Sequence, residues 1–346
     1  MPTPQDPHRR ALTLLSAGDV AAQLQGRERQ LIDLVAQAYV THGRGESCLP
    51  QSEFLRFPGR GLNLNLARER IISKAGYLGG PHPVAGIKWI ASFPDNVAQG
   101  LPRASALMVL NCLQTGRPTT VMEGSLISGQ RTAAGAALAA RWLHAGPAYE
   151  AVGVIGCGPI SSETLRFLRA DARPIGRIVL FDLDRQRMQA CAAQLRDSHF
   201  GGELQLASSA EAVLGACDLV MLGTSAVEPS VHTLAMCSAG STLLHVSLRD
   251  FSVEAVQQAD NLADDIGHVL QAQTSAHRTM QALGHKNFMR ATLADVIEGR
   301  AAPRVGGRPV MFHPFGLAAL DLAFAQFVAQ GCAAAGAGTV VPDFLV

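Results

Sequence analysis

The stretch from residue 150 to residue 182 constrains the fold of this chain more than any other feature. An apolar run, Ala151 to Ile155, leads into the turn Gly156-Cys157-Gly158-Pro159-Ile160-Ser161, and a stretch with helical periodicity follows. A second apolar run, Arg177 to Phe181, ends on Asp182. This order of strand, glycine turn, helix, strand and acid is typical of a dinucleotide-binding βαβ unit.

The residues of the glycine turn suit a pyrophosphate. Gly156 permits the tight turn, and Gly158 lets the backbone approach the phosphates. A helix that begins at Pro159 and Ile160 directs its free N–H groups and the positive end of its dipole at the same point. Because Ser161 replaces the third glycine of the usual pattern, a tight turn in another kind of α/β protein is the alternative interpretation.

Asp182 indicates which dinucleotide is bound. It follows Gly158 at about the spacing of the carboxylate that accepts hydrogen bonds from the adenosine ribose. Its charge would repel a 2′-phosphate and so favours NAD over NADP, although Arg185 and Arg187 lie close behind it. Cys157, inside the turn, is expected to be a small filler and not a nucleophile.

Composition limits the class of protein. A chain of 346 residues with 48% hydrophobic and 16% charged residues is expected to fold into about two globular domains. A net charge of +1 gives no field to attract nucleic acid or an anionic membrane. No apolar run approaches the length of a membrane span, and the first ten residues lack the apolar core of a secretion signal. The seven cysteines form no CxxC pair and no metal-ligand spacing, which favours reduced thiols in the cytoplasm and no metal site.

The order of predicted elements indicates an α/β protein with two domains. Residues 1–130 form a strand-rich α+β substrate domain, which residues 310–346 complete, and residues 148–309 form a Rossmann-type NAD-binding domain. The first domain is predicted to hold two helices within residues 11–43 and strands at 53–57, 70–73, 84–91, 104–111 and 119–123. A long helix from Arg131 to His144, capped by Ser128, leads to the second domain, whose strands are predicted at 152–155, 177–181, 204–207, 218–223, 242–247 and 261–264.

Two cations outside the glycine turn are candidates for holding an anion. Lys88 lies in an apolar strand, where a lone lysine is costly unless it meets a partner or a ligand; an outward-facing edge-strand lysine is the alternative. Arg131 at the start of a helix opposes the helix dipole unless both bind the same anion, with surface exposure as the alternative. Arg70 and Arg103 are weaker candidates for the same pocket.

Polar residues near two strand ends of the second domain are further candidates. Asp250 follows the strand that ends at Ser247 and is a candidate proton acceptor, with a helix cap as the alternative. Thr224 and Ser225 follow the strand 218–223 and are expected to contact the cofactor. His245 is interpreted as a core histidine, whereas His82 and His313 are expected in loops without metal partners.

Several motifs together resemble the ornithine cyclodeaminase/μ-crystallin family, from about Leu62 to Ala323. They are Gly86-Ile87-Lys88, Thr115-Gly116-Arg117-Pro118, Arg131-Thr132-Ala133-Ala134, the glycine turn, and His313-Pro314-Phe315-Gly316-Leu317-Ala318 with Asp321. The strings Gly86-Ile87-Lys88-Trp89-Ile90 and Met122-Glu123-Gly124-Ser125-Leu126-Ile127-Ser128 resemble one branch, which forms 2,3-diaminopropionate in staphyloferrin B biosynthesis.

The resemblance implies roles for the candidate residues. Lys88 and Arg131, with Arg70 and Arg103, would hold substrate carboxylates, and Asp250 and Lys88 would do the proton transfer. The cofactor-binding set would be Arg131, Thr132, Gly156, Gly158, Pro159, Ile160, Asp182, Thr224, Ser225, Ser247, Asp250 and Gly316. The loop Leu248-Arg249-Asp250 differs from the Gly-Asp loop of the cyclodeaminases, which counts against ornithine as the substrate, and Asn is common where His313 stands.

The resemblance also implies an activity. It is NAD-dependent oxidation of N-(2-amino-2-carboxyethyl)-L-glutamate to 2,3-diaminopropionate and 2-oxoglutarate, by a homodimer that associates through the strand-rich domain. An ornithine or lysine cyclodeaminase, a ketimine reductase and an alanine dehydrogenase are alternatives within the family. A ligand-binding protein like μ-crystallin is the non-enzymatic alternative, but an aromatic content of 5% offers little to a large aromatic ligand.

Overall fold

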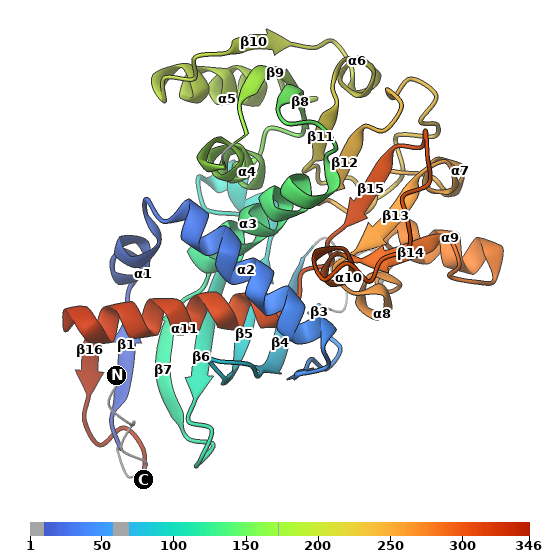
Figure 1. Cartoon of the computed structure of the whole chain (residues 1–346). Coiled ribbons are helices and arrows are strands. Elements are labelled where there is room, and N and C mark those ends of the chain that lie inside the picture. Colours follow the sequence, from blue (N-terminus) through green and yellow to red (C-terminus); the bar gives the residue numbers. More distant parts are fainter. Residues whose placement is uncertain (1–9, 58–68, 172) are drawn as a thin grey trace. The chain divides into compact units, whose positions relative to one another are not determined.

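A computed structural model describes residues 10–57, 69–171 and 173–346. The chain forms two compact units: unit 1 is residues 1–131 with 317–346, and unit 2 is residues 132–316. Within the described residues each unit contains an eight-stranded sheet (Figure 1). Leu62, where the family resemblance was predicted to begin, lies outside the described residues, as do the first nine residues.

The sheet of unit 1 is mostly antiparallel. Its order is β16-β1-β7-β6-β5-β4-β2, and β3 pairs with β4. The strands are β1 Leu12–Leu15, β2 Ser47–Cys48, β3 Glu53–Arg56, β4 Arg70–Leu78, β5 Val84–Ser92, β6 Ala104–Asn111, β7 Pro118–Glu123 and β16 Thr339–Val341. The five predicted strands are confirmed, and the prediction missed β2 as well as β1 and β16, which pair the two ends of the chain.

Helices cover one face of this sheet. The helices of unit 1 are α1 Ala17–Leu24, α2 Glu28–Gly43, the 3-10 helix η1 Pro94–Gln99, the first part of α3 and α11 Ala318–Ala335. α11 packs across β4, β5 and β6, and α2 packs on α11 (Figure 1). A Cβ atom at Gly76 would lie 3.2 Å from the Ala318 Cβ, and one at Gly86 would lie 3.1 Å from Leu322 Cδ2. The two glycines therefore allow α11 to approach the strands closely.

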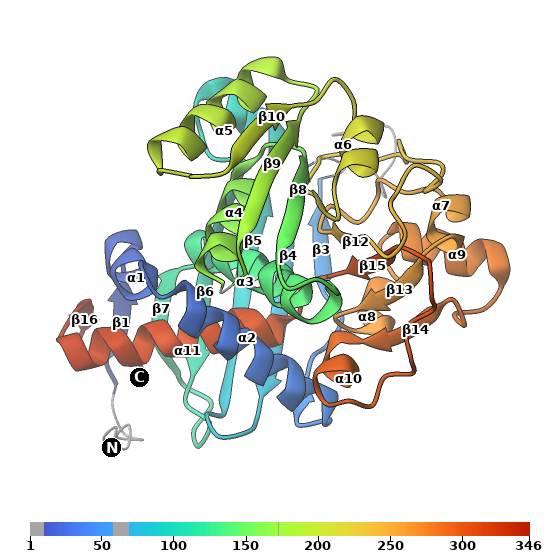
Figure 2. The same cartoon turned by 45° about the horizontal axis from the view of Figure 1, so that its top comes forward.

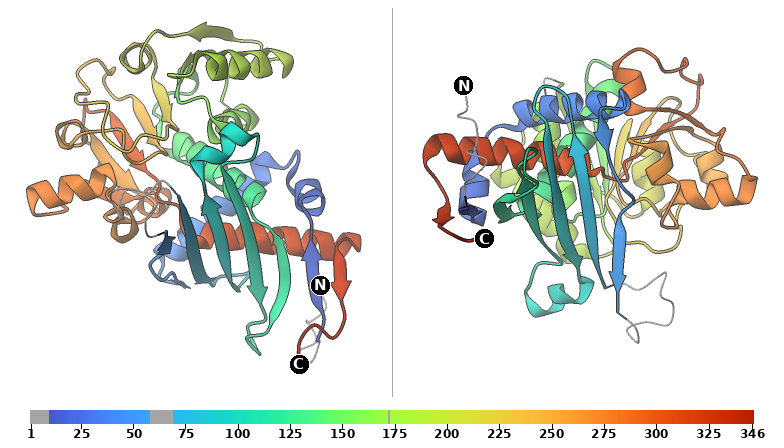
Figure 3. Two further views of the ribbon diagram at one scale, coloured as in Figure 1. Left: turned by 180° about the vertical axis from the view of Figure 1, so that it is seen from behind. Right: turned by 90° about the horizontal axis from the view of Figure 1, so that it is seen from below.

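The two faces of the sheet differ in their side chains. Lys88, Met108 and Met122 are aligned across β5, β6 and β7 and are almost fully buried on the face that α11 covers. Trp89 and Leu107 are aligned on the opposite face and are 45% and 52% exposed. The left view of Figure 3 shows β4 to β7 lying in front of α11, so neither α2 nor α11 covers this face.

α11 is long and apolar enough to cross a membrane by length and composition alone. Most of its first half is nevertheless buried within unit 1, including Leu320, Leu322 and Phe324. Its Asp321 also binds two cations of the same unit. These contacts identify α11 as the core helix of unit 1.

The sheet of unit 2 is parallel, in the order β10-β9-β8-β11-β12-β15-β13-β14. Helices lie along it, with α6 on β8 and α5 on β9 (Figure 2). Its strands are β8 Tyr149–Ile155, β9 Ile175–Phe181, β10 Glu203–Leu206, β11 Leu219–Leu222, β12 Thr242–His245, β13 Asp260–Ala263, β14 Met289–Thr292 and β15 Val310–His313. Its helices are the remainder of α3, α4 Pro159–Ala170, α5 Arg185–Asp197, α6 Ala210–Ala216, α7 Val253–Gln257, α8 Ile266–Val269, α9 Ser275–Leu283 and α10 Leu293–Ile297.

The predicted return to the first domain at residue 310 is wrong. β15 lies between β12 and β13 and pairs with both, so it belongs to the sheet of unit 2. The chain leaves unit 2 only after Gly316. A buried parallel strand needs partners on both edges, and the apolar run Val310–His313 provides this one.

The predicted start of the long helix is also wrong. α3 spans Ser125–Leu143, and the Glu123 carboxylate accepts hydrogen bonds from the N–H groups of Ser125 and Leu126 at its start. Ser128 therefore lies within the helix and does not cap it. Arg131 lies inside the helix as well, so the predicted conflict with the dipole at the helix start does not arise.

Candidate functional site

The glycine turn of unit 2 requires glycine at its first position. Gly156 follows β8 with φ = +90°, and a Cβ atom there would lie 2.7 Å from the Gly223 carbonyl oxygen. The Gly156 N–H donates to the Phe181 carbonyl oxygen at 2.9 Å and so fixes the turn against the end of β9. Both the backbone angle and the close approach exclude a side chain at this position.

The second glycine borders open space. A Cβ atom at Gly158 would meet no protein atom within 4 Å. Gly158 is also the N-cap of α4, which no side chain caps and which begins with a proline. Open space in front of an uncapped helix start fits a pyrophosphate group. The Ser161 hydroxyl donates to the Gly156 carbonyl oxygen, which explains how the turn accommodates serine in place of the third glycine.

Asp182 is fixed to the same turn. One carboxylate oxygen accepts from the Cys157 N–H at 2.7 Å, and the other accepts from the Asp184 N–H at 2.8 Å. Each oxygen keeps a second lone pair, so these bonds leave room for ribose hydroxyls. The ribose role of Asp182 remains a prediction. Cys157 is buried, as expected of a filler.

Unit 1 contains a buried cluster of two cations around one carboxylate. Lys88 Nζ lies 2.7 Å from Asp321 Oδ2, and Arg131 Nε donates to Asp321 Oδ1 at 2.9 Å. Lys88 also donates to the Ser128 hydroxyl at 3.2 Å. Lys88 and Asp321 are each 1% exposed and Arg131 is 8% exposed, so the two alternatives, an outward-facing lysine and a surface arginine, are wrong.

Charge in this cluster is unbalanced. Burial lowers the pKa of Lys88 to about 7, although the charge of Asp321 opposes the change. Burial also opposes ionisation of Asp321, but Arg131 and Lys88 outweigh it and lower the pKa of this carboxyl group. With both cations protonated the three groups carry one excess positive charge. An added carboxylate would supply the missing counter-charge and would favour protonated Lys88.

Arg70 and Arg103 both lie near the Ser92 end of β5, which is four positions along the strand from Lys88. Arg70 begins β4 opposite Ser92, whereas Lys88 is opposite Lys74. Arg70 and Lys74 are four positions apart along β4, roughly 13 Å at the usual rise. Arg103 is exposed just before β6, and its carbonyl oxygen accepts from the Phe93 N–H. Their substrate roles remain predictions.

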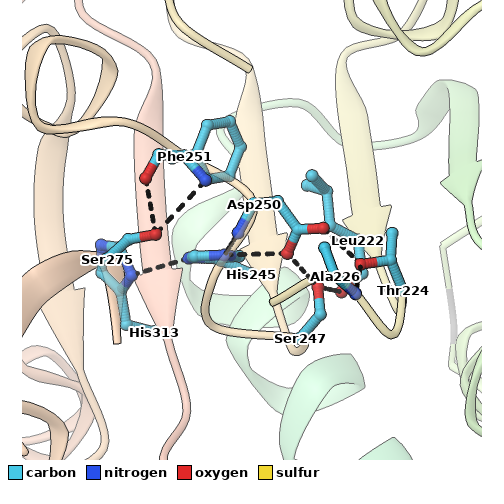
Figure 4. A network of polar contacts seen from close by, with 9 residues as sticks. All are labelled: Leu222, Thr224, Ala226, His245, Ser247, Asp250, Phe251, Ser275 and His313. Carbon is cyan, nitrogen blue, oxygen red and sulfur yellow. Dashed lines mark hydrogen bonds and ion pairs between the residues drawn. The ribbon is translucent and has the colours of Figure 1, made fainter. Parts of the chain in front are cut away.

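Asp250 of unit 2 is fully buried, and three side chains contact its carboxylate. Its Oδ1 accepts a hydrogen bond from the Thr224 hydroxyl, and its Oδ2 accepts one from the Ser247 hydroxyl. His245 Nε2 lies 3.1 Å from Oδ2, and the Asp250 N–H points at the same nitrogen at 3.2 Å (Figure 4). Ser252 is the N-cap of α7, so the alternative role of Asp250 as that cap is wrong.

Burial and hydrogen bonding oppose each other at Asp250. Burial raises the pKa of this carboxyl group, but the bonds from His245, Ser247 and Thr224 outweigh it and lower the pKa overall. Because the side chain is 0% exposed, protons must reach it through the half-buried hydroxyls of Thr224 and Ser247. Asp250 therefore has no direct opening to solvent within unit 2.

The sequence did not predict that two histidines extend this network. His245 is buried, as predicted, and its Nδ1 lies 3.0 Å from His313 Nδ1. His313 is the last residue of β15 and 1% exposed, so its predicted place in a loop is wrong. His313 Nε2 lies 3.0 Å from the Asn261 side-chain oxygen. The sequence did contain one indication of this network, because each of the three strands carries a polar residue among apolar ones.

The other predicted cofactor residues lie at the same edge of unit 2 or along α3. Thr224 and Ser225 follow β11, and Ser247 follows β12. Gly316 has φ = +87°, and its N–H donates to Asp264 at 2.7 Å, which fixes the loop after β15. Thr132 follows Arg131 in α3 and is the first residue of unit 2. The ends of neighbouring parallel strands are where such folds bind ligands.

Together the two sheets and the glycine turn define a protein with a Rossmann-type dinucleotide-binding unit and a separate, mostly antiparallel unit. The chain belongs to the ornithine cyclodeaminase/mu-crystallin family, whose profile matches residues 67–335.

The chain is similar over nearly its whole length to characterised members. It is 26% identical to the N-((2S)-2-amino-2-carboxyethyl)-L-glutamate dehydrogenase of Staphylococcus aureus, covering 96% of this chain and 98% of that protein. It is 25% identical to the alanine dehydrogenase of Archaeoglobus fulgidus, covering 92% and 94%. The Thermococcus litoralis Delta(1)-pyrroline-2-carboxylate reductase, solved with NADH and L-proline, shares the fold with a TM-score of 0.85 at 23% identity, covering 95% and 99%.

Proposed function

We propose that this chain is an NAD-dependent oxidoreductase that acts on the CH–NH bond of an amino acid. The observation that carries the proposal is the excess positive charge of Lys88, Arg131 and Asp321, buried in a protein whose other unit has a dinucleotide-binding turn. The full-length similarity to two amino acid dehydrogenases supports it.

Unit 2 would hold the cofactor. The pyrophosphate would lie at Gly158 and the start of α4, and Asp182 would accept hydrogen bonds from the adenosine ribose. The bound nicotinamide supplies a hydride acceptor, and the protein supplies alignment and charge. The carboxylate of Asp182 favours NAD over NADP because a 2′-phosphate beside it would be repelled.

Unit 1 would hold a carboxylate of the substrate. Lys88 and Arg131 already share one carboxylate, and a second anion would balance their charge. Asp250 would receive the proton of the reacting amine through Thr224 or Ser247, because no oxygen of Asp250 is exposed. Both roles, anion binding in unit 1 and proton transfer in unit 2, are argued from contacts within a single unit.

The specific substrate we propose is N-(2-amino-2-carboxyethyl)-L-glutamate. With NAD and water it would give 2,3-diaminopropionate, 2-oxoglutarate, NADH and a proton. Its three carboxylates suit a site with several fixed cations. The similarity to the Staphylococcus aureus dehydrogenase over nearly the full length of both chains supports this substrate. A role in siderophore biosynthesis would follow, in the cytoplasm.

The test is turnover of defined substrates by the purified protein. We expect the synthetic conjugate and NAD to give NADH and 2-oxoglutarate in equal amounts. NADH formation from alanine instead would identify an alanine dehydrogenase, the second candidate, which the 25% identity to the archaeal enzyme favours. Ammonia release from ornithine without net NADH would identify a cyclodeaminase. A protein that binds NADH but turns over none of these would contradict the proposal.

We also propose that the protein is a homodimer through the uncovered face of the unit 1 sheet. Trp89, Leu107 and Leu55 are 45%, 52% and 49% exposed, and the strand register places all three on this face. Apolar side chains of this size favour burial against a second copy. Leu107→Glu should shift the molar mass in solution from dimer to monomer, and an unchanged mass would exclude this face.

A further inference from the structure

A chain of buried polar side chains crosses three neighbouring strands of unit 2. Asn261 lies on β13, His313 ends β15 and His245 ends β12, and these strands are adjacent in the sheet. Asp250 follows His245, and the four side chains are at most 1% exposed. Figure 4 shows His313, His245 and Asp250 pointing toward one another. Buried donors and acceptors must be matched, so each proton position can be worked out.

Asn261 fixes the direction of the hydrogen bonds along this row of side chains. Its amide nitrogen donates to the carbonyl oxygens of Val256 at 2.8 Å and Ala259 at 3.1 Å. Reversing the amide would place its oxygen against two carbonyl oxygens, which cannot donate. The side-chain oxygen must therefore face His313, and it can only accept a hydrogen bond.

His313 then has only one neutral tautomer. Its Nε2, 3.0 Å from the Asn261 oxygen, must carry the proton. Burial and the neighbouring His245 lower the pKa of His313 well below its usual value, which is consistent with a neutral ring. Its Nδ1 therefore carries a lone pair and no proton, and this nitrogen faces His245 Nδ1 at 3.0 Å.

The consequence falls on His245 and Asp250. His245 Nδ1 must carry a proton, because its partner nitrogen does not. Its other nitrogen, Nε2, lies 3.1 Å from Asp250 Oδ2. A neutral His245 facing an ionised Asp250 would place a lone pair against a buried carboxylate. One proton between Nε2 and Oδ2 satisfies this contact, and the Asp250 N–H, which points at Nε2 at 3.2 Å, is a second donor to the same nitrogen.

We propose that Asp250 and His245 form a dyad that holds one shared proton, and that Asn261, acting through the tautomer of His313, is what keeps this proton in place. Asp264, which directly follows β13, is a further buried acid; it accepts from the backbone N–H groups of Phe315 and Gly316, and burial raises its pKa. Thr224 and Ser247 contact the two oxygens of Asp250 and connect the dyad to less buried positions.

The shared proton gives the dyad a role in the reaction, and this part rests on the proposed function. In amine oxidation the C–H bond gives its electron pair and hydrogen to NAD, a C=N bond forms, and the proton lost from nitrogen passes to the dyad. In imine reduction NADH gives the hydride and the dyad gives the proton to nitrogen. Oxidation should therefore quicken as pH rises and the dyad empties, whereas reduction should slow.

The first experiment reads the protons directly in the resting protein. Full-length protein with ¹⁵N-labelled histidine is examined by two-bond ¹H–¹⁵N correlation, with signals assigned from His245→Asn and His313→Asn. We expect neutral His313 protonated at Nε2, and His245 protonated at Nδ1. A His313 ring protonated at Nδ1, or a His245 ring protonated only at Nε2, would overturn the proposal. No turnover is needed, so failure of the proposed function would not affect this result.

The second experiment separates a positioning role from a structural one. His313→Leu removes the acceptor for the His245 Nδ1 proton, so the dyad should lose its proton at a pH lower by roughly one unit. His313→Asn places an amide oxygen near the former Nδ1 and should restore the wild-type midpoint. We expect NADH affinity to stay unchanged in both, and the exposed His285→Leu to change nothing. If a folded His313→Leu variant loses the dyad proton at the same pH as the wild type, the proposal is contradicted. If that variant does not fold, the histidine spectra of the first experiment test the proposal instead.

Discussion

Two buried carboxylates, Asp321 in unit 1 and Asp250 in unit 2, are stabilised in different ways. Both are at most 1% exposed, and a bare carboxylate is very costly in such a place. Asp321 binds two basic groups, the permanently charged Arg131 and Lys88, whose pKa burial lowers to about 7. Asp250 instead contacts an imidazole and two hydroxyl groups.

The difference indicates a division of labour between the units. When Lys88 is protonated, the cluster of Asp321 carries one excess positive charge, so it favours a bound anion. The network of Asp250 is electrically balanced by one mobile proton, so it suits proton transfer. Substitutions at these two carboxylates should therefore affect different measurable quantities.

The largest effect on stability is expected at Asp321. Asp321→Asn leaves Lys88 and Arg131 buried side by side without a counter-charge, which should lower the free energy of unfolding by about 3–5 kcal/mol. Urea denaturation followed by circular dichroism measures it. The control is Glu228→Gln, which breaks the exposed pair with Arg278 and should cost less than about 1 kcal/mol. Equal decreases in the free energy of unfolding of the two variants would show that water screens the Asp321 cluster.

The next largest effect is expected at Asp250, on the rate instead of on binding. Asp250→Asn removes the proton acceptor while keeping the shape, so kcat should fall on the order of 10²–10⁴-fold with KM and NADH affinity little changed. Steady-state kinetics and NADH fluorescence titration measure the two quantities. Asp197→Asn, at an exposed position at the end of α5, is the control. A fully active Asp250→Asn variant would remove the proton role from unit 2.

Local patterns predicted most of the fold and part of each cluster, namely Lys88 and Arg131 in unit 1 and Asp250 in unit 2. The glycine turn and the alternation of strands and helices predicted the parallel fold of unit 2, because the residues of a βαβ unit are close together in sequence. Lys88 was identifiable as a lone charge in an apolar strand, and Asp250 as an acid after a strand. Asp321 was noted only as part of a family motif, because its partners lie far away in the sequence.

What the sequence could not predict depends on long-range pairing. β1 and β16 join the two ends of the chain, and the short runs of each give no sign of that partner. β15 was assigned to the wrong domain because its place between β12 and β13 depends on strands far from it in sequence. His245, His313 and Asn261 come together for the same reason. Each was visible as a polar residue in an apolar strand, but their contact required the strand order.

The two glycines of the turn should separate folding from cofactor binding in unit 2. Gly156→Ala forces a side chain into positive φ and against the Gly223 carbonyl, so it should cost at least about 1 kcal/mol of stability. Gly158→Val meets no protein atom at its Cβ, so the protein should fold normally. Its side chain would occupy the proposed pyrophosphate position and weaken NADH binding roughly tenfold or more, about 1.4 kcal/mol.

Thermal melting and NADH titration measure these two outcomes. Gly201→Val is the matched control, because its Cβ also meets nothing within 4 Å and its φ is not positive. Normal NADH binding by Gly158→Val would place the pyrophosphate elsewhere.

The last expected effect is the gradual pH dependence of the unit 1 cluster. The folded pKa of Lys88, about 7, lies below its usual value of 10.5, so between these values the unfolded chain binds the extra proton. Stability should therefore rise with pH across this window, by at most about 1.4 kcal/mol per pH unit. Anion affinity should change in the opposite sense, because a neutral Lys88 attracts a carboxylate less strongly.

Urea denaturation and substrate KM, each measured from about pH 6 to pH 9, provide the two profiles. In Lys88→Met both contributions should disappear, which separates Lys88 from all other titrating groups. If wild-type stability and KM follow the same profiles as Lys88→Met, the lysine keeps its proton throughout. The unit 1 cluster would then be a fixed charge, and only the Asp250 network of unit 2 would respond to pH.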